Sequence, residues 1–256
     1  MSKNNKINKV IKIGLVGDGA VGKTTFLLSY TAQSFLTEYT PTIFDNFCQI
    51  ESVGNDVFNV SLWDTAGQDE YSTYRAGCYS NCSFDVFLLC FSVVQRSSFK
   101  NIKNKWILEL KKNAPSVPVI VVGTQTDLRN EKDKEHISKK EVCFRLNNTQ
   151  GEKMAKELKA KRYVECSSKS YETTHDVVLA AIDDYLDKEK EMVAKIKKQY
   201  KKEIEEEEKM MKIMKKELEK QRAQEEKEKK EADKKEEKKD AAPPKEEKKE
   251  TKEQQQ

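Results

Sequence analysis

The sequence predicts an α/β domain with a mostly parallel sheet and helices on both of its faces, followed by one long charged helix. Up to about residue 187, short apolar segments typical of buried strands alternate with segments of helical periodicity. Beyond that point the sequence consists mainly of Lys and Glu. Strands and helices in alternation favour a parallel sheet, whose ligand-binding loops lie at the carboxyl ends of the strands.

Six segments have the character of β-strands. Two of them flank Gly54-Asn55-Asp56 and should form a hairpin, which gives the sheet one antiparallel edge strand. The longest apolar runs, residues 84–91 and 117–123, are typical of central strands. In chain order the predicted strands are residues 10–16, 47–53, 57–63, 84–91, 117–123 and 163–166.

Helical segments lie between these strands. Residues 23–32 follow a glycine-rich loop, and residues 97–112 carry apolar side chains at helical spacing. Two further helices are predicted, one at residues 153–158 and one that begins at Thr173. The alternation therefore continues to the end of the predicted domain.

The distribution of charge defines the domain organisation. From Lys188 onward, 24 Lys/Arg and 21 Asp/Glu fall within 69 residues, whereas residues 1–187 carry 24 and 23. We expect an N-terminal tail at 1–9, a domain at 10–187, a charged helix or weak coiled coil at 188–240, and a disordered tail at 241–256. A helix over 188–240 would be about 80 Å long. Its thin apolar stripe, residues 193–218, could bind a partner helix, although Glu207 and Glu208 interrupt it.

Several classes of protein are excluded by composition. Neither part has the one-sided positive charge expected of a nucleic-acid-binding protein. The six cysteines lack the spacing and the neighbouring His of a zinc site, and we interpret them as reduced thiols. No apolar run approaches the ~18 residues of a membrane span, and no apolar signal region opens the chain. We therefore expect a cytoplasmic protein, which partners could recruit to a membrane or to the cell cortex.

Residues 17–24, Gly-Asp-Gly-Ala-Val-Gly-Lys-Thr, match the pattern GxxxxGK[ST] between a predicted strand and a predicted helix. In that context the backbone amides wrap the phosphates of a nucleotide. Lys23 would reach the β- and γ-phosphates, and the Thr24 hydroxyl would bind Mg²⁺. The alternative, a glycine turn followed by a chance Lys-Thr pair, does not account for the flanking strand and helix.

A second motif, Thr124-Gln125-Thr126-Asp127, follows the strand at 117–123. The Asp127 carboxylate can accept two hydrogen bonds from guanine, from N1–H and from the 2-amino group, whereas adenine offers no such pair of donors. An Asp after a strand is more often a turn or capping residue. Its position beside the phosphate-binding motif favours the interpretation as a guanine ligand.

Together these motifs resemble the Rho family of small GTPases within the Ras superfamily, and its Rac-like members in particular. The resemblance covers about residues 10–186, and five motifs carry it in the family's order: GDGAVGKTT, EYTPTIFDNF, LWDTAGQDEY, VVGTQTDLR and YVECSSK. It implies a P-loop NTPase G domain with a Rho-type insert at about 130–147.

The resemblance also implies a set of site residues. Gln68 is the expected catalytic residue, which orients the attacking water. Mg²⁺ would be held by Thr24 and Thr42 directly and by Asp64 through water, while Phe35 would pack on the guanine. The expected nucleotide-binding residues are Asp18, Gly19, Ala20, Val21, Gly22, Lys23, Thr24, Thr25, Phe35, Tyr39, Thr42, Asp64, Gly67, Thr124, Gln125, Asp127, Ser167, Ser168 and Lys169. The expected effector region comprises Tyr39, Thr40, Pro41, Thr42, Ile43, Phe44, Asp45, Asn46 and Phe47.

The sequence departs from the Rac-like pattern at several positions. Gln125 replaces the usual Lys, Ser168 replaces an Ala, and Phe47 replaces a Tyr. The second switch, residues 71–83, is about two residues longer than in Rac-like proteins. No cysteine follows Cys166, so we expect no prenyl anchor.

The sequence thus predicts a GTP hydrolase that binds GTP/GDP with Mg²⁺ and switches its binding to Rho-type effectors, under exchange factors and GTPase activators, in signalling to the actin cytoskeleton. One alternative is a nucleotide-binding scaffold with little turnover whose charged tail mediates interactions. Another is a P-loop ATPase or kinase, in which ATP would compete with GTP.

Overall fold

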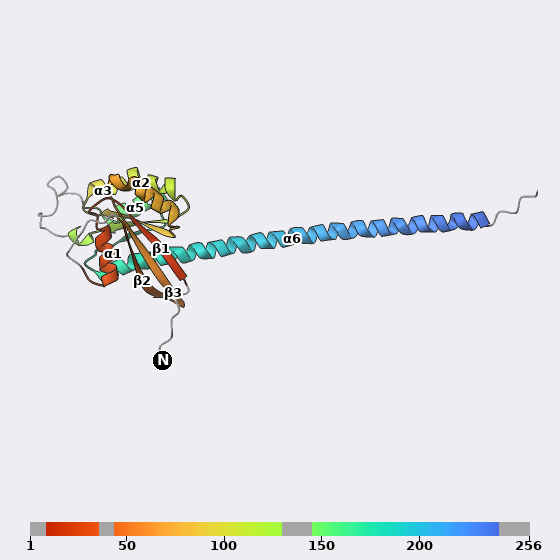
Figure 1. Ribbon diagram of the computed structural model, residues 1–256, viewed down its shortest axis with the longest axis horizontal. Helices are drawn as coiled ribbons and strands as arrows, with labels where there is room; N and C mark the ends of the chain where they lie inside the picture. Colours follow the sequence, from red (N-terminus) through yellow and green to blue (C-terminus); the bar gives the residue numbers. More distant parts are fainter. Residues whose placement is uncertain (1–8, 36–43, 130–144, 241–256) are drawn as a thin grey trace, which may run out of the picture. The chain divides into compact units, whose positions relative to one another are not determined.

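The structure is a computed structural model, and it describes residues 9–35, 44–129 and 145–240. Contacts between residues divide the chain into two units, residues 1–191 and residues 192–256. The first unit holds the sheet and its covering helices (Figure 1). The second consists, in its described part, of the continuation of the last helix.

The order of elements follows the predicted alternation. The strands are β1 (Lys9–Val16), β2 (Phe44–Val53), β3 (Asp56–Thr65), β4 (Val86–Ser92), β5 (Val119–Thr124) and β6 (Tyr163–Glu165). The α-helices are α1 (Lys23–Ala32), α2 (Ser72–Asn81), α3 (Arg96–Asn101), α4 (Ile107–Asn113), α5 (Asn148–Leu158) and α6 (Tyr171–Asp240). Three short helices complete the set: the 3₁₀ turns η1 (Asp69–Tyr71) and η3 (Thr126–Arg129), and the π turn η2 (Ile102–Trp106).

The six strands form one sheet in the order β2-β3-β1-β4-β5-β6. β2 pairs antiparallel with β3 through the turn at Gly54-Asn55, while every other pair in the sheet is parallel. β4 is buried along its whole length, as expected for a central strand with helices on both faces. The predicted fold class, with six strands and one antiparallel edge strand, is therefore confirmed.

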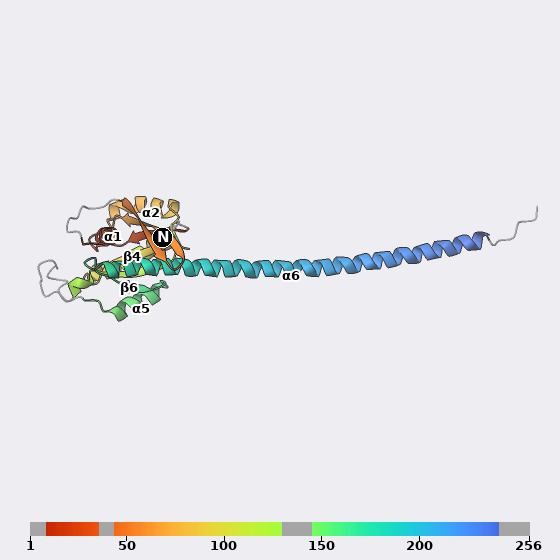
Figure 2. The same cartoon turned by 90° about the horizontal axis from the view of Figure 1, so that it is seen from below.

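Each face of the sheet has its own hydrophobic core. On one face, Phe26 and Leu27 of α1 and Val178 and Ile182 of α6 pack against β1, β3 and β4. On the other face, helices α2, α4 and α5 and the turn η2 provide the packing, with Trp106 fully buried. α5 packs beside β5 and β6 at the far edge of the sheet (Figure 2).

Several predicted boundaries were wrong, and one predicted helix contains an irregular turn. α5 begins at Asn148 rather than at 153, because a capping box stabilises its start. The backbone amide of Gln150 donates to the Asn147 side chain, and the backbone amide of Asn147 donates to the Gln150 side chain. The last strand ends at Glu165, one residue before the predicted end. The predicted helix at 97–112 is helical throughout but contains the π turn η2.

Helix α2 was not predicted. Its sequence, STYRAGCYSN, lacks an apolar repeat, and only Arg75 and Tyr79 of this helix are buried. These two side chains are four residues apart and therefore lie on one face of the helix. Because Arg is charged, the sequence shows no apolar pattern that would identify this buried face.

The Rho-type insert expected at 130–147 lies mostly outside the described residues. Of its last three residues, Leu146 is fully buried, and its amide donates to the Val93 carbonyl at 2.9 Å. The chain therefore returns to the core just before α5 begins.

The last helix of the first unit and the charged segment are one helix, since α6 runs from Tyr171 to Asp240 without a break. The long charged C-terminal helix predicted from the sequence is thus present. Within the described residues, no helix combines the length and apolarity needed to cross a membrane.

Replacing Asn147 by Ala should lower the free energy of unfolding by about 1 kcal/mol, because α5 loses the side chain that satisfies its first free amides. Urea unfolding followed by circular dichroism measures the change. The Asn148→Ala variant is the control, since Asn148 only contacts Glu152 on the exposed face of the helix. Equal losses in both variants would show that the capping box adds nothing.

Candidate functional site

The glycine-rich loop between β1 and α1 has a backbone that side chains would obstruct. A Cβ atom on Gly17 would lie 2.2 Å from the carbonyl oxygen of Cys90 on β4. Gly22, the N-cap of α1, has a φ of +88°, a conformation that glycine adopts without strain. Among the described residues, no side chain caps α1, so its first amides remain available to bind an anion.

Lys23 lies at the centre of this loop and is only 6% exposed. Its ammonium group donates to the carbonyl oxygens of Gly17 and Asp18, at 2.9 and 2.8 Å. Burial lowers the pKa of Lys23 from its ordinary value, and the nearby carboxylate of Asp64 opposes this shift. The loop thus holds the Lys23 ammonium group against two main-chain carbonyl oxygens. The positive charge of this group is suited to binding phosphate oxygens.

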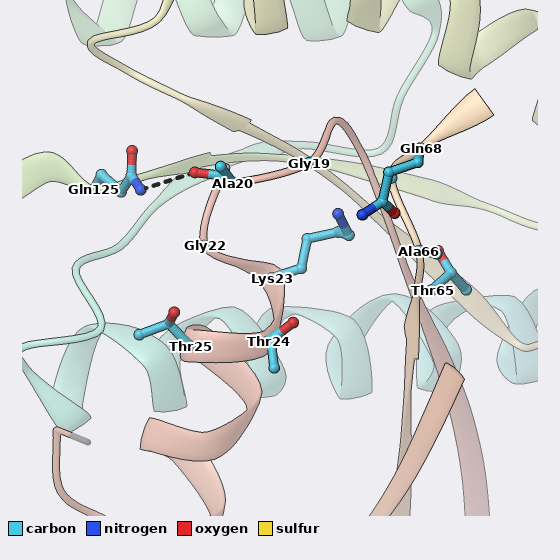
Figure 3. Close-up of a pocket in the computed structure, with 11 residues that line it drawn as sticks. Gly19, Ala20, Gly22, Lys23, Thr24, Thr25, Thr65, Ala66, Gln68 and Gln125 are labelled. Carbon is cyan, nitrogen blue, oxygen red and sulfur yellow. Dashed lines mark hydrogen bonds between the residues drawn. The ribbon is translucent and has the colours of Figure 1, made fainter. Parts of the chain in front are cut away.

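The pocket around Lys23 is formed by the phosphate loop, the end of β3 and the residues that follow β3 (Figure 3). It collects many of the residues predicted from the sequence and adds Thr65 and Ala66, which the sequence analysis missed. Both follow directly from Asp64 at the end of β3, the position at which an open α/β sheet binds its ligand. The lining residues are Gly19, Ala20, Gly22, Lys23, Thr24, Thr25, Thr65, Ala66, Gly67, Gln68 and Gln125.

Thr24 and Asp64 bring oxygen atoms together at this pocket. The Thr24 hydroxyl donates to the Asp64 carboxylate at 2.5 Å, and Asp64 is 1% exposed. A hydroxyl and a carboxylate are hard oxygen donors of the kind that Mg²⁺ uses together with phosphate oxygens. The donor set therefore fits a magnesium ion. Thr42, the other expected ligand, lies outside the described residues.

The segment after β3 packs directly on the phosphate loop. A Cβ atom on Gly67 would lie 2.3 Å from the amide nitrogen of Gly19, so only glycine fits there. A Cβ atom on Gly19 would meet nothing within 4 Å, which leaves open space beside the loop. The Gln68 side chain points from this segment toward the Lys23 ammonium (Figure 3). Gln68 and Lys23 thus line the same pocket.

A buried arginine holds the backbone around Gln68. Arg75 of α2 is 1% exposed and donates to the carbonyl oxygens of Ala66 at 2.9 Å and Gln68 at 2.6 Å. It also forms a two-bond ion pair with Glu109 of α4, at 2.9 and 3.0 Å. Burial disfavours the charge, but Glu109 more than offsets it, and the pKa of Arg75 is raised above its ordinary value. Sequence analysis missed both residues, because neither belongs to a recognisable motif.

The same network reaches the phosphate loop. The Arg75 guanidinium lies 4.8 Å from the ring centre of Trp106, whose indole N–H donates to the Asp18 carboxylate at 2.6 Å. Asn101 donates to the other Asp18 oxygen at 2.7 Å. The Asp18 side chain, which belongs to the predicted nucleotide-binding set, therefore contacts the helical segment α3–η2 and fixes the loop from outside.

Three predicted base-binding residues lie together at the carboxyl end of β5 and β6. The Asp127 carboxylate accepts a hydrogen bond from Ser167 at 2.7 Å and forms an ion pair with Lys169 at 3.0 Å. Both partners hold the carboxylate in one orientation. The carbonyl of Ser168 accepts the Ser29 hydroxyl of α1 at 2.5 Å, which ties this loop to the helix after the phosphate loop.

Thr124 and Gln125 connect the base-binding loop to the phosphate loop. The buried Thr124 hydroxyl lies 2.6 Å from the carbonyl oxygen of Val21 and 2.8 Å from that of Phe91. Gln125 has a φ of +59°, and its amide donates to the Ala20 carbonyl at 3.3 Å (Figure 3). Gln125, which is shorter than the Lys usual at this position, therefore still contacts the phosphate loop.

The remaining predicted residues are placed only in part. Phe35, the expected contact of the guanine ring, is 43% exposed after α1. In the expected effector region, Asp45, Asn46 and Phe47 lie on β2, the edge strand, opposite Asp64, Trp63 and Leu62. Tyr39, Thr40, Pro41, Thr42 and Ile43 lie outside the described residues, and only the backbone of Phe44 is described.

The fold and this pocket define a P-loop nucleotide-binding domain, with a phosphate loop before α1 and a carboxylate loop after β5. Residues 12–187 match the family model described as "Ras family", so the chain belongs to the Ras family. It is therefore a small GTPase of the Ras superfamily, a class that binds guanine nucleotide together with Mg²⁺.

Replacing Glu109 by Gln should lower the free energy of unfolding by about 1–3 kcal/mol, because the buried Arg75 loses its charged partner. Chemical unfolding of the nucleotide-bound protein measures the loss. The matched control is Glu157→Gln, which removes an exposed ion pair with Lys103 and should change stability by less than about 0.5 kcal/mol. If both variants are equally stable, Glu109 does not hold Arg75 in the way described.

Proposed function

We propose that this protein is a GTP-hydrolysing switch of the Rho-like type. The observation that carries the proposal is the position of Gln68, whose side chain points at the Lys23 ammonium in the phosphate pocket. The Rho-like assignment is supported by the motifs of the sequence, including EYTPTIFDNF at residues 38–47.

The described residues divide the work of binding and hydrolysis. The amides of the phosphate loop and the Lys23 ammonium would hold the phosphates. Thr24 and Thr42 would hold Mg²⁺ directly, and Asp64 would hold it through water. Bound Mg²⁺ would neutralise the charge that develops on the phosphate oxygens. Gln68 orients the attacking water in line with the leaving group, and the backbone bonds from Arg75 keep this segment in place. The open space beside Gly19 admits an arginine from an activating partner.

The close contact between Gly67 and the phosphate loop explains how the switch responds to the nucleotide. A terminal phosphate must be accommodated beside Gly67, and its amide can then donate to a phosphate oxygen. Loss of that phosphate removes the contact and releases the segment. Effectors would read this change, together with the change at residues 39–47, while exchange factors would replace GDP by GTP.

The remaining parts of the proposal rest on the sequence. By resemblance to Rho proteins, the effectors belong to signalling to the actin cytoskeleton. We assign the GTPase domain to residues 10–187, with the insert at about 130–147, and terminal tails to residues 1–9 and 241–256. A cytoplasmic protein of this kind would reach a membrane or the cell cortex through its partners.

Replacing Gln68 by Leu should lower the rate of GTP hydrolysis by at least about tenfold, because the attacking water loses its orienting group. A single-turnover assay with purified protein, Mg²⁺ and labelled GTP measures this. If the values of Ras apply, the unmodified protein turns over at roughly 10⁻⁴–10⁻³ s⁻¹.

Gln49→Leu, on β2 and outside the pocket lining, should leave the rate unchanged. GTP affinity should change little in either variant, which separates loss of catalysis from loss of folding. A chain that binds GTP but never hydrolyses it, even with a Rho activator protein, would instead be a nucleotide-binding scaffold.

Replacing Asp127 by Asn should weaken GTP binding by about 100-fold or more, because a carboxylate that accepts two hydrogen bonds becomes an amide with one acceptor and one donor group. The same change should improve binding of xanthosine triphosphate, whose 2-oxo group accepts the new amide N–H. Calorimetric titration of both nucleotides with Mg²⁺ gives the two affinities. Asp176→Asn, on the exposed face of α6, is the control. Unchanged GTP affinity, or ATP binding as tight as GTP binding, would exclude the proposed base contact.

A further inference from the structure

The second unit of the chain exposes a regular apolar stripe. Side chains along residues 193–218 of α6 are between 47% and 69% exposed at the apolar positions of this stripe. At about 100° per residue they fall within an arc of roughly 80°, so they form one straight line along the helix. The stripe begins with Val193, Ile196, Tyr200, Ile204, Met211 and Met214.

The charged residues along this stripe change sign in the middle. Lys195, Lys197, Lys198, Lys201 and Lys202 precede residue 203, and Glu203 and Glu205 to Glu208 follow it. On one flank of the stripe, Lys197 and Lys201 come first and Glu205 and Glu208 follow, as the helical periodicity requires. Within residues 197–208 this flank is therefore positive first and negative afterwards, and Lys212 and Lys215 follow on the same flank.

We propose that this stripe binds the same stripe of a second copy of the chain, with the two helices antiparallel. Charge complementarity determines the partner and the direction. In an antiparallel pair the same flank of both helices meets, running in opposite directions, so Lys197 and Lys201 lie opposite Glu208 and Glu205 of the second copy. A parallel pair in register would bring the acidic ends of the two copies together.

The apolar side chains support the same register. With the two-fold axis near residues 202 and 203, Val193 lies opposite Met211 of the second copy, and Tyr200 lies opposite Ile204. Glu207, which interrupts the stripe, is then level with Lys197 of the second copy, so that this Lys lies near both Glu207 and Glu208.

Charged residues outside the flank that carries Lys197 and Glu208 are used within the helix. Lys202 and Glu206 form an exposed i,i+4 ion pair at 3.6 Å, and Gln199 donates to Glu203 at 3.0 Å. Lys202 and Glu206 lie on the side of the helix opposite to the stripe and do not compete with the proposed contact. Exposed pairs of this kind add little stability, so the stripe provides the driving force for pairing.

The full-length chain should form a dimer in sedimentation equilibrium, with twice the monomer mass of 29.6 kDa. Ile204→Glu should raise the dissociation constant of the dimer by at least about tenfold, since it buries a carboxylate in the centre of the contact. Ile213→Glu is the matched control, because Ile213 is 52% exposed, close to the 55% of Ile204, but lies on the opposite side of the helix. A monomer at all concentrations, or equal effects of the two variants, would overturn the proposal. So would a monomer that instead binds anionic phospholipid vesicles.

The direction of pairing is tested by disulfide trapping of single-cysteine additions. Mixed chains carrying Val193→Cys and Met211→Cys should form a heterodimer under mild oxidation, above the background of the unmodified chain. Val193→Cys alone should form no disulfide-linked homodimer above that background, since in the antiparallel pair its two copies are roughly 27 Å apart along the helix. Efficient trapping of Val193→Cys with itself would show a parallel pair and overturn the proposed register.

Discussion

The phosphate pocket depends on how closely three stretches of backbone approach one another. The loop after β1 lies against the Cys90 carbonyl of β4 on one side, at Gly17, and against Gly67 on the other. Neither contact leaves space for a Cβ atom. Because the loop is confined in this way, its amides and carbonyls point in fixed directions, and the buried Lys23 is held by two of those carbonyls. The backbone of the loop therefore has little room to change its shape.

Side chains outside the pocket also hold its backbone in place. Arg75 holds the backbone at Ala66 and Gln68, and Trp106 joins Arg75 to the Asp18 carboxylate. The π turn that contains Trp106 interrupts the helical segment where these contacts converge. The segment carrying Gln68 and the loop carrying Lys23 are thus attached to the same helix. Both can respond together when either one moves.

Much of the fold could be predicted because its signals are local. Strand and helix alternation, the hairpin at Gly54-Asn55 and the loop at residues 17–24 each leave a pattern in a short stretch of sequence. Helix α2 and the extended start of α5 could not be predicted in the same way. In α2 the buried face is formed by Arg75 and Tyr79, and the charge of Arg75 is tolerated only because Glu109, distant in sequence, neutralises it. The ligand motifs were visible, whereas the residues that hold them in place were not.

The link through Thr124 has a consequence for the kinetics of the ligand. Its hydroxyl connects the strand before the base-binding loop to the Val21 carbonyl in the phosphate loop, and Gln125 adds a bond to Ala20. A partner protein that displaces the base-binding loop would therefore also disturb the contacts of the phosphate loop, and the reverse holds too. A change in either loop should therefore alter the dissociation rate of the whole nucleotide.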